Sequence, residues 1–407
     1  MDKDSKDASV APTLGIEGAD YLEDAVRQRV RGFIETIIEE ELEAALGRGR
    51  YERSDGEAHG YLNGRRARQV MGTFGAEAIQ VPRARVAGED GGSREWRSRA
   101  LGRYQRRTQR AEALIAQAYL AGTNTRRVKH ALRTLFGGAV GKDVVSRAWR
   151  KVQTDWQPWN ARDLSGEDIV RLILDGTVVK ARIARKATHI PVLVAVGIRR
   201  DGQKVLLAIQ NMGGETQAAW HAFLADMSAR GLREPELVIV DGAPGLEAAL
   251  TRLWPNVTMQ RCTVHKHRNL LAHAPKRLHA ELGADYRDMM YAETAAEVER
   301  QRRLFLRKWG EKCPAVAKSL KEAGEELFTF TRLPPSQWKS ARTTNAVERL
   351  HAEFKRRIKT QTVLPQAETA PMLFWALLAS GEITMRKVDG WETLHEPMAA
   401  QPIDLAA

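Results

Sequence analysis

This 407-residue sequence contains only two cysteines and no long apolar run. Cys262 and Cys313 are too few for a disulfide framework, which favours a reducing compartment. The N-terminal segment MDKDSKDASV lacks the apolar core of a secretory signal. The most apolar stretch, Met372 to Ala379, is far shorter than the roughly 20 residues that span a bilayer. The sequence therefore predicts a cytoplasmic protein with no membrane partner.

Acidic residues are fewer than basic ones: the chain has 51 Asp and Glu and 64 Lys and Arg, which gives a formal net charge of +13. Such a balance favours a polyanionic partner such as nucleic acid. Arginines gather in one short segment, where a phosphate backbone would neutralise them: Arg94, Arg97, Arg99, Arg103, Arg106, Arg107 and Arg110. A merely basic protein is the alternative, since charge alone does not identify the partner.

The length exceeds that at which one hydrophobic core keeps growing, which predicts two or three structural units. We expect residues 1–18 to be loose. Apolar residues from Val26 to Ile38 recur at helical spacing, as in a helix that packs internally or dimerises. The alternation from Ala78 to Val86 predicts short strands with a basic face. Residues 1–100 are thus expected to form a small basic α+β region that binds DNA.

Residues 101–160 have a helical pattern and form the next predicted region. The expected helices cover 108–120, 124–135 and 142–152, with a turn at Gly137 and Gly138. Two short helices joined by a Gly-containing turn resemble the helix-turn-helix of DNA readers, although simple helix packing stays open as an alternative. The candidate DNA contacts of this region are Arg103, Arg106, Arg107, Lys142, Arg147 and Arg150.

Residues 161–380 alternate between strand and helix patterns in the order βββαβαβ. The expected strands cover 169–174, 189–198, 204–210, 237–240 and 257–262, and the helices between them cover 216–230 and 246–253. This order is typical of an RNase H-like fold, in which the first and fourth strands are neighbours in a mixed sheet. We interpret the polar helical stretch from 266 to about 335 as an insertion.

The predicted fold class is therefore multidomain α/β. It combines an RNase H-like mixed-sheet catalytic domain, which carries the helical insertion, with a mainly helical DNA-binding region before it. Helices over 343–360 and near 367–378 close the domain, and residues 381–407 are expected to be a C-terminal tail with a disordered end.

Three carboxylates stand where this fold would bring them together. Asp175 and Asp241 each follow an apolar strand, and Glu348 lies on the helix over 343–360 that would pack on the sheet. Phosphodiester transfer needs negative charge neutralised on the attacking and leaving oxygens, a task suited to two metal ions about 4 Å apart. We expect Asp175 to bridge two Mg²⁺ ions, with Asp241 and Glu348 each completing one site.

Several of these residues have structural alternatives. Asp175 and Asp241 precede glycines and could be ordinary strand-to-turn residues. Asn345 and Glu348 are spaced as the N-cap and N3 residues of a capping box. The basic residues near Glu348 could contact DNA phosphates or simply form a solvated face: Arg342, Lys355, Arg356 and Arg357.

Cys262 and His265 could form half of a zinc site. No second half stands at suitable spacing, because Cys313 is isolated, so the sequence favours a structural role for both residues.

In these motifs the sequence resembles the Mutator-type transposases of bacterial insertion sequences, part of the DDE group. The likeness covers nearly the whole chain: NGRRARQVMGTFGAEAIQVPRAR, LILDGTVVKAR around Asp175, GETQAAWHAFLADMSARGL, VIVDGAPGLEAAL around Asp241, RCTVHKHRNL, and TTNAVERLHAEFKRRIKT around Glu348. One departure is His351, where family members often carry Asn.

The resemblance implies that Asp175, Asp241 and Glu348 are the catalytic triad and that Cys262 and His265 form the family's Cys-x-x-His motif. It further implies that the N-terminal part binds terminal inverted repeats, and that cleavage releases a 3′-OH that attacks target DNA. The expected cofactor is Mg²⁺, for which Mn²⁺ can substitute, and the expected location is the bacterial nucleoid. Because two double-stranded DNA ends must be synapsed, we expect a homodimer.

Two other functions stay open at this point. A domesticated DNA-binding or regulatory protein would retain the fold without transposing, although the presence of all three carboxylates favours an enzyme. A metal-dependent nuclease would use the same ions and carboxylates but would not transfer strands.

Overall fold

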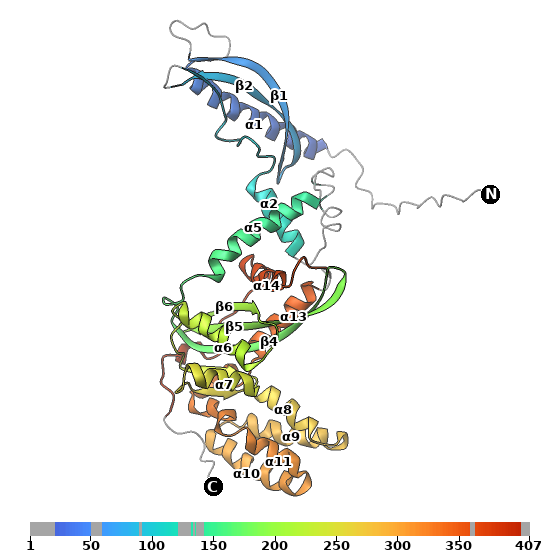
Figure 1. Cartoon of the computed structure of the whole chain (residues 1–407), viewed down its shortest axis with the longest axis vertical. Coiled ribbons are helices and arrows are strands. Elements are labelled where there is room, and N and C mark those ends of the chain that lie inside the picture. The colour runs from blue at the N-terminus through green and yellow to red at the C-terminus, as the bar shows by residue number, and fades with distance from the viewer. Residues whose placement is uncertain are drawn as a thin grey trace, which may run out of the picture. The chain divides into compact units, whose positions relative to one another are not determined.

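The computed structural model divides the chain into two compact units, which are residues 1–116 with 125–148, and residues 117–124 with 149–407 (Figure 1). The residues described are 21–49, 59–88, 92–120, 132, 135, 142–358 and 363–399. The segments expected to be loose, 1–18 and the last residues of the chain, lie outside them. The domain limits near 100, 160 and 380 stay a prediction.

The first unit contains a helix packed on a small antiparallel sheet. Helix α1 (Tyr21–Leu46) contacts β2 (Gly75–Ala87), which pairs with β1 (Gly60–Gly72) and with β3 (Ser93–Glu95). The core contains Ile38, Val70, Ile79, Val81 and Leu101. The predicted α+β arrangement is thus confirmed.

The apolar stripe over 26–38 is only partly internal. Ile38 is fully buried, whereas Val26 and Phe33 are 49% and 69% exposed. The helix packs through Ile34, Ile38, Leu42 and Leu46 instead, a stripe displaced toward its C-terminal end.

Two further helices are α2 (Gln109–Leu120) and α5 (Lys142–Asn160). The predicted helix over 124–135 lies outside the described residues except for 132 and 135. The first helix and the turn of the predicted helix-turn-helix therefore lie outside them too, whereas its second helix is the start of α5. Helix α5 extends well beyond the expected end at Val152, because Trp156 and Trp159 pack against Trp375, with ring centroids 5.6 and 5.7 Å away.

The second unit is built on a five-stranded mixed sheet in the order β6-β5-β4-β7-β8. Its strands are β4 (Ile169–Ile183), β5 (Lys186–Arg199), β6 (Lys204–Asn211), β7 (Leu237–Val240) and β8 (Met259–Arg261). The first three are antiparallel, and β7 and β8 run parallel to β4. The prediction that the first and fourth strands of this region are neighbours is confirmed.

Helices cover both faces of this sheet (Figure 1). One face packs against α6 (Gln217–Ala229) and α7 (Pro244–Leu253), and the other packs against α13 (Asn345–Ile358) and α14 (Thr369–Ala379). Strand β4 serves both, because Leu172 and Leu174 face the first layer and Ile173 faces the second. This double burial explains the continuous apolar run that the sequence displays.

A helical segment separates β8 from α13, as predicted. It contains α8 (Thr263–Ala272), α9 (His279–Met290), α10 (Ala295–Lys312), α11 (Pro314–Glu322) and α12 (Pro335–Ala341), with short 3₁₀ turns at Lys276–Leu278, Glu325–Leu327 and Thr329–Arg332. The expected C-terminal tail is not free over its described part, which includes a 3₁₀ turn at Trp391–Thr393, since Ile383, Val388 and Leu394 are buried in the core. No helix among the described residues is long and apolar enough to cross a membrane.

Candidate active site

Strand register aligns Asp175 with Asp241. The last paired residues of the parallel strands β4 and β7 are Ile173 and Ile239, and each aspartate follows two positions later. Side chains two positions apart share one face of a strand, and neighbouring strands lie about 4.8 Å apart. Both aspartates therefore leave the sheet at the same level, on the face that α13 covers.

Asp175 does not end its strand, contrary to the sequence-based expectation. Strand β4 continues to Ile183, and Asp175 pairs with Val194 within the antiparallel ladder. Gly176 misled the prediction, because it marks a close approach rather than a turn: a Cβ there would lie 2.3 Å from Oε1 of Glu215.

Asp241 begins the turn from β7 into α7. Its Oδ1 accepts a hydrogen bond from the backbone N–H of Ala243 at 2.9 Å, and Gly242 supplies the positive φ of +92° that the turn requires. The turn alternative thus accounts for one carboxylate oxygen. Among the described residues Oδ2 has no hydrogen-bond partner, so it is available to a ligand.

Glu348 lies near the start of α13, off the buried stripe of Val347 and Leu350. Its carboxylate oxygens lie 3.4 Å from the Arg268 guanidinium, and Oε1 lies 3.6 Å from His265 Nε2. No hydrogen bond links it back to Asn345 among the residues described, so the capping-box alternative finds no support there.

His351 follows Glu348 by one turn and contacts Asp175. Its Nδ1 lies 3.2 Å from Asp175 Oδ2, and both side chains are buried. The ring packs edge-on against Phe374 of α14, which fixes its orientation. Nε2 is buried and has no hydrogen-bond partner among the residues that the structure describes. The departure from asparagine at this position therefore retains a nitrogen donor toward Asp175.

Glu215 is a fourth carboxylate at this site, and the sequence reasoning did not single it out. It precedes the N-cap Thr216 of α6 and approaches β4 over Gly176. The pKa of Glu215 is raised, first by partial burial and then by the negative charges of Asp241 and Asp175. Glu215 is thus close enough to both aspartates for their charge to act on it, although it contacts Gly176 on the face of β4 opposite to Asp175.

Cys262 and His265 lie beside Glu348. Cys262 is fully buried, and its Sγ accepts hydrogen bonds from the backbone N–H and the hydroxyl of Thr344, both at 3.4 Å. Burial alone would raise the pKa of the Cys262 thiol, but hydrogen bonds from His265 and Thr344 outweigh it and leave that pKa lowered. The pKa of His265 is raised, chiefly by Cys262.

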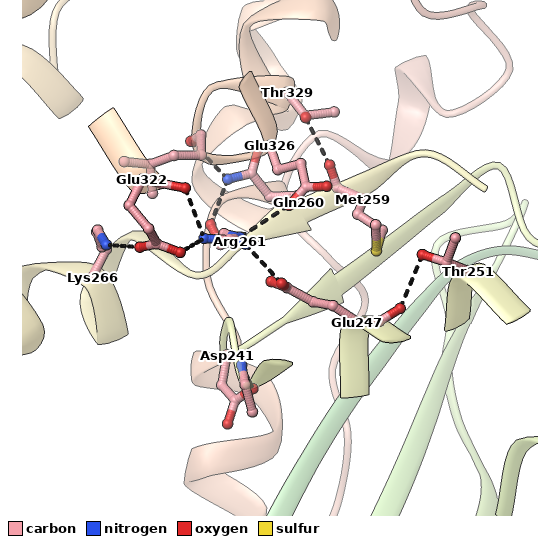
Figure 2. Close-up of polar contacts among 12 residues, drawn as sticks. Asp241, Glu247, Thr251, Met259, Gln260, Arg261, Lys266, Glu322, Glu326 and Thr329 are labelled. Carbon is pink, nitrogen blue, oxygen red and sulfur yellow. Dashed lines mark hydrogen bonds and ion pairs between the residues drawn. The ribbon is translucent and has the colours of Figure 1, made fainter. Parts of the chain in front are cut away.

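Arg261 anchors β8 to its surroundings (Figure 2). Its guanidinium donates to Glu247 of α7 at 2.7 Å, to Glu322 of α11 at 2.9 Å and to Glu326 at 2.9 Å. Lys266 reaches Glu322 at 2.8 Å. This network joins the sheet, α7 and the helical insertion next to Cys262.

In the first unit, arginines line a cavity of about 820 Å³ together with Trp96 and Tyr104. Three of them, Arg103, Arg106 and Arg107, are predicted DNA contacts. The full set is Arg66, Arg68, Arg83, Arg97, Arg103, Arg106 and Arg107. Within the described part of the chain, only Arg107 among them pairs with a carboxylate, that of Glu112. Burial and the neighbouring Arg66 and Arg106 lower the pKa of Arg68, whose guanidinium donates to the carbonyls of Gly102 and Gln105.

The remaining basic candidates differ from one another. Arg150 and Lys355 are exposed, and the side chains of Lys142 and Arg147 lie outside the described part of α5. Arg342 is buried, donates to the carbonyl of Met290 and stacks on Tyr291, so its guanidinium is not free for DNA. Two others bind Glu353 instead, namely Arg356 and Arg357.

Known proteins resemble this chain along most of its length. The family model described as "Transposase, Mutator family" matches residues 5–385. The chain is 31% identical over 354 residues to the transposase for insertion sequence element ISRM5 of Rhizobium meliloti (strain 1021), covering 87% of each chain. It is 30% identical over 389 residues to the transposase for IS1081 of Mycobacterium tuberculosis, covering 94% of this chain and 92% of that one. The chain belongs to the Mutator family of transposases.

Proposed function

We propose that this transposase cleaves DNA and transfers 3′-OH ends with Asp175, Asp241 and Glu348 as its catalytic residues. The observation that carries the proposal is the β4–β7 register, which aligns the two aspartates on the face covered by α13. The sheet order, with its antiparallel half and parallel half, supports an RNase H-like classification of the second unit.

The donor set fits Mg²⁺. Carboxylate oxygens are the ligands that hard divalent cations prefer, and Mn²⁺ shares the preference. The raised pKa of Glu215, caused by burial and by two neighbouring aspartates, indicates crowded negative charge that a cation would offset. When bound, two such ions would activate the attacking oxygen and neutralise charge on the phosphate.

The chain's own residues orient these carboxylates. His351 donates from Nδ1 to Asp175 Oδ2, while the N–H of Ala243 fixes Oδ1 of Asp241. Glu348 comes from a helix whose apolar stripe packs on the sheet, so its position depends on that packing. Asp175 is buried, at 7% exposure, whereas the Glu348 side chain is 27% exposed.

We further propose that the arginine-lined cavity binds the phosphate backbone of double-stranded DNA at the element's ends. Arg66 and Arg106 both lie close enough to Arg68 for their charge to act on it, and neither pairs with a carboxylate among the described residues, which suits phosphate contacts. Because two ends must be joined, the proposal includes a homodimer. Replacing Arg66 and Arg106 by alanine should weaken end binding and lower the slope of log affinity against log salt by about two.

Cleavage and joining of labelled DNA that carries the element's ends test the catalytic proposal. Glu348→Gln and Asp241→Asn should each lower Mg²⁺-dependent cleavage by more than about 100-fold, with DNA binding retained. Glu234→Gln is the matched control, since this exposed carboxylate lies in the loop before β7. End binding without metal-dependent chemistry would indicate a DNA-binding protein, and cleavage without joining would indicate a nuclease.

A further inference from the structure

Cys262 has no task in the proposed chemistry, because Mg²⁺ does not take thiolate ligands. Backbone contacts nevertheless fix the position of this residue. The backbone N–H of Cys262 donates to the carbonyl of Val240 at 2.7 Å, and the residue is the N-cap of α8. Strand β8 and helix α8 thus hold a fully buried thiol next to a candidate catalytic carboxylate.

Three different ligand types converge at this point. The sulfur of Cys262, a ring nitrogen of His265 and a carboxylate oxygen of Glu348 all lie within 4.8 Å of one another. Ligands bound tetrahedrally to zinc at 2.0–2.3 Å lie roughly 3.3–3.8 Å apart. The 3.6 Å between His265 Nε2 and Glu348 Oε1 already falls in that range, and side-chain rotation closes the rest.

Thr344 contacts two of these side chains, those of Cys262 and His265. Its hydroxyl lies 3.4 Å from both Cys262 Sγ and His265 Nδ1, and it carries a single proton. Outer hydrogen bonds of this kind orient metal ligands in proteins.

Nε2 of His265 lies 3.6 Å from a carboxylate oxygen of Glu348, with the Cys262 sulfur beside both. Arg268 also contacts this carboxylate, at 3.4 Å. The combination of thiolate, imidazole and carboxylate selects a thiophilic ion over Mg²⁺.

We propose that Cys262, His265 and Glu348 form a binding site for Zn²⁺, with water as the fourth ligand. The site adjoins the Mg²⁺ pair proposed above and shares Glu348 with it. Binding at this site does not depend on the proposed catalytic function, so each can fail without the other.

Cobalt substitution tests the site, because Co²⁺ bound to a thiolate has a charge-transfer band in the near ultraviolet. The full chain, reduced and freed of metal by a chelator, is titrated with Co²⁺ in the absence of DNA. We expect a sulfur-to-cobalt band that saturates at one ion per chain. Stoichiometric Zn²⁺ should bleach it, and millimolar Mg²⁺ should not.

Variants then assign the ligands. Cys313→Ser should retain the band, since Cys313 is the other thiol of the chain, whereas Cys262→Ser should lose it. Because Cys262 is buried and its replacement could unfold the protein, His265→Gln provides a second variant at a half-buried position. It should raise the Co²⁺ concentration at half-saturation at least about tenfold. Absence of the band in the wild type, or its persistence in Cys262→Ser, would overturn the proposal.

Discussion

Replacement of Arg261 by methionine should destabilise the second unit by about 3–5 kcal/mol. Most of this loss should come from the lost ion pair with Glu247. The side chains of Arg261 and Glu247 are only 14% and 15% exposed, and removing one member of a buried ion pair costs about this much. Glu326 and Glu322 are more exposed, at 36% and 62%, so each adds at most ~1 kcal/mol.

The predicted loss depends on pH in a defined direction. Burial already raises the pKa of Glu247, and removal of Arg261 raises it further. A carboxyl whose folded pKa exceeds its unfolded pKa lowers stability as the pH rises from the unfolded value to the folded value, and the loss is complete above the folded value. The difference between Arg261→Met and wild type should therefore be full at neutral pH and shrink as the pH falls toward the ordinary glutamate pKa of about 4.3.

Urea unfolding followed by tryptophan fluorescence measures this loss, because all tryptophans except Trp96 lie after residue 148. Arg200→Met is the matched control. Arg200 also pairs with two carboxylates, but it is 44% exposed and should cost less than about 1 kcal/mol. Adding Glu247→Gln to Arg261→Met should recover most of the stability. A loss that is independent of pH, or that the second substitution does not reduce, would refute the assignment to Glu247.

Three further substitutions probe the site. Gly176→Ala should displace the exposed Glu215 side chain and cost at most about 1 kcal/mol, and Glu215→Ala in the same chain should remove this cost; an additive loss in thermal unfolding would contradict the contact. His351→Asn should keep cleavage within about tenfold of wild type and His351→Leu should lower it about 10–100-fold, whereas equal rates would show that Asp175 needs no donor there. Thr216→Ala should cost about 1 kcal/mol in urea unfolding by uncapping α6, and no loss would contradict the cap.

The sequence predicts the sheet and its helices well because their periodicities differ. Strand β7 is a continuous apolar run, and helix α13 buries an apolar stripe at helical spacing. Both patterns are visible in the sequence. Pairing Asp175 with Asp241 also follows from strand order alone. Gly176 shows the limit, since the same Asp-Gly step that ends a strand elsewhere here makes room for a glutamate from another element.

Contacts between segments that are distant in the sequence could not be predicted, for a different reason. Thr344 contacts Cys262 across 82 residues, and no local pattern encodes that meeting. Arg342 looked like a surface residue because it stands in a basic stretch, yet Tyr291 and Met290 enclose its guanidinium. Glu215 lies on a loop whose path depends on how α6 packs, so its approach to the aspartates was not predictable.

The helical insertion separates parts of the protein that are synthesised at different times. The arginine-lined cavity, Asp175 and Asp241 all precede the insertion in the chain, and Glu348 follows it. With the proposed roles, a polypeptide that stopped within the insertion would compete for the element's ends without a complete cutting site. Incomplete translation would then act as a brake on transposition and would not scatter breaks through the host chromosome.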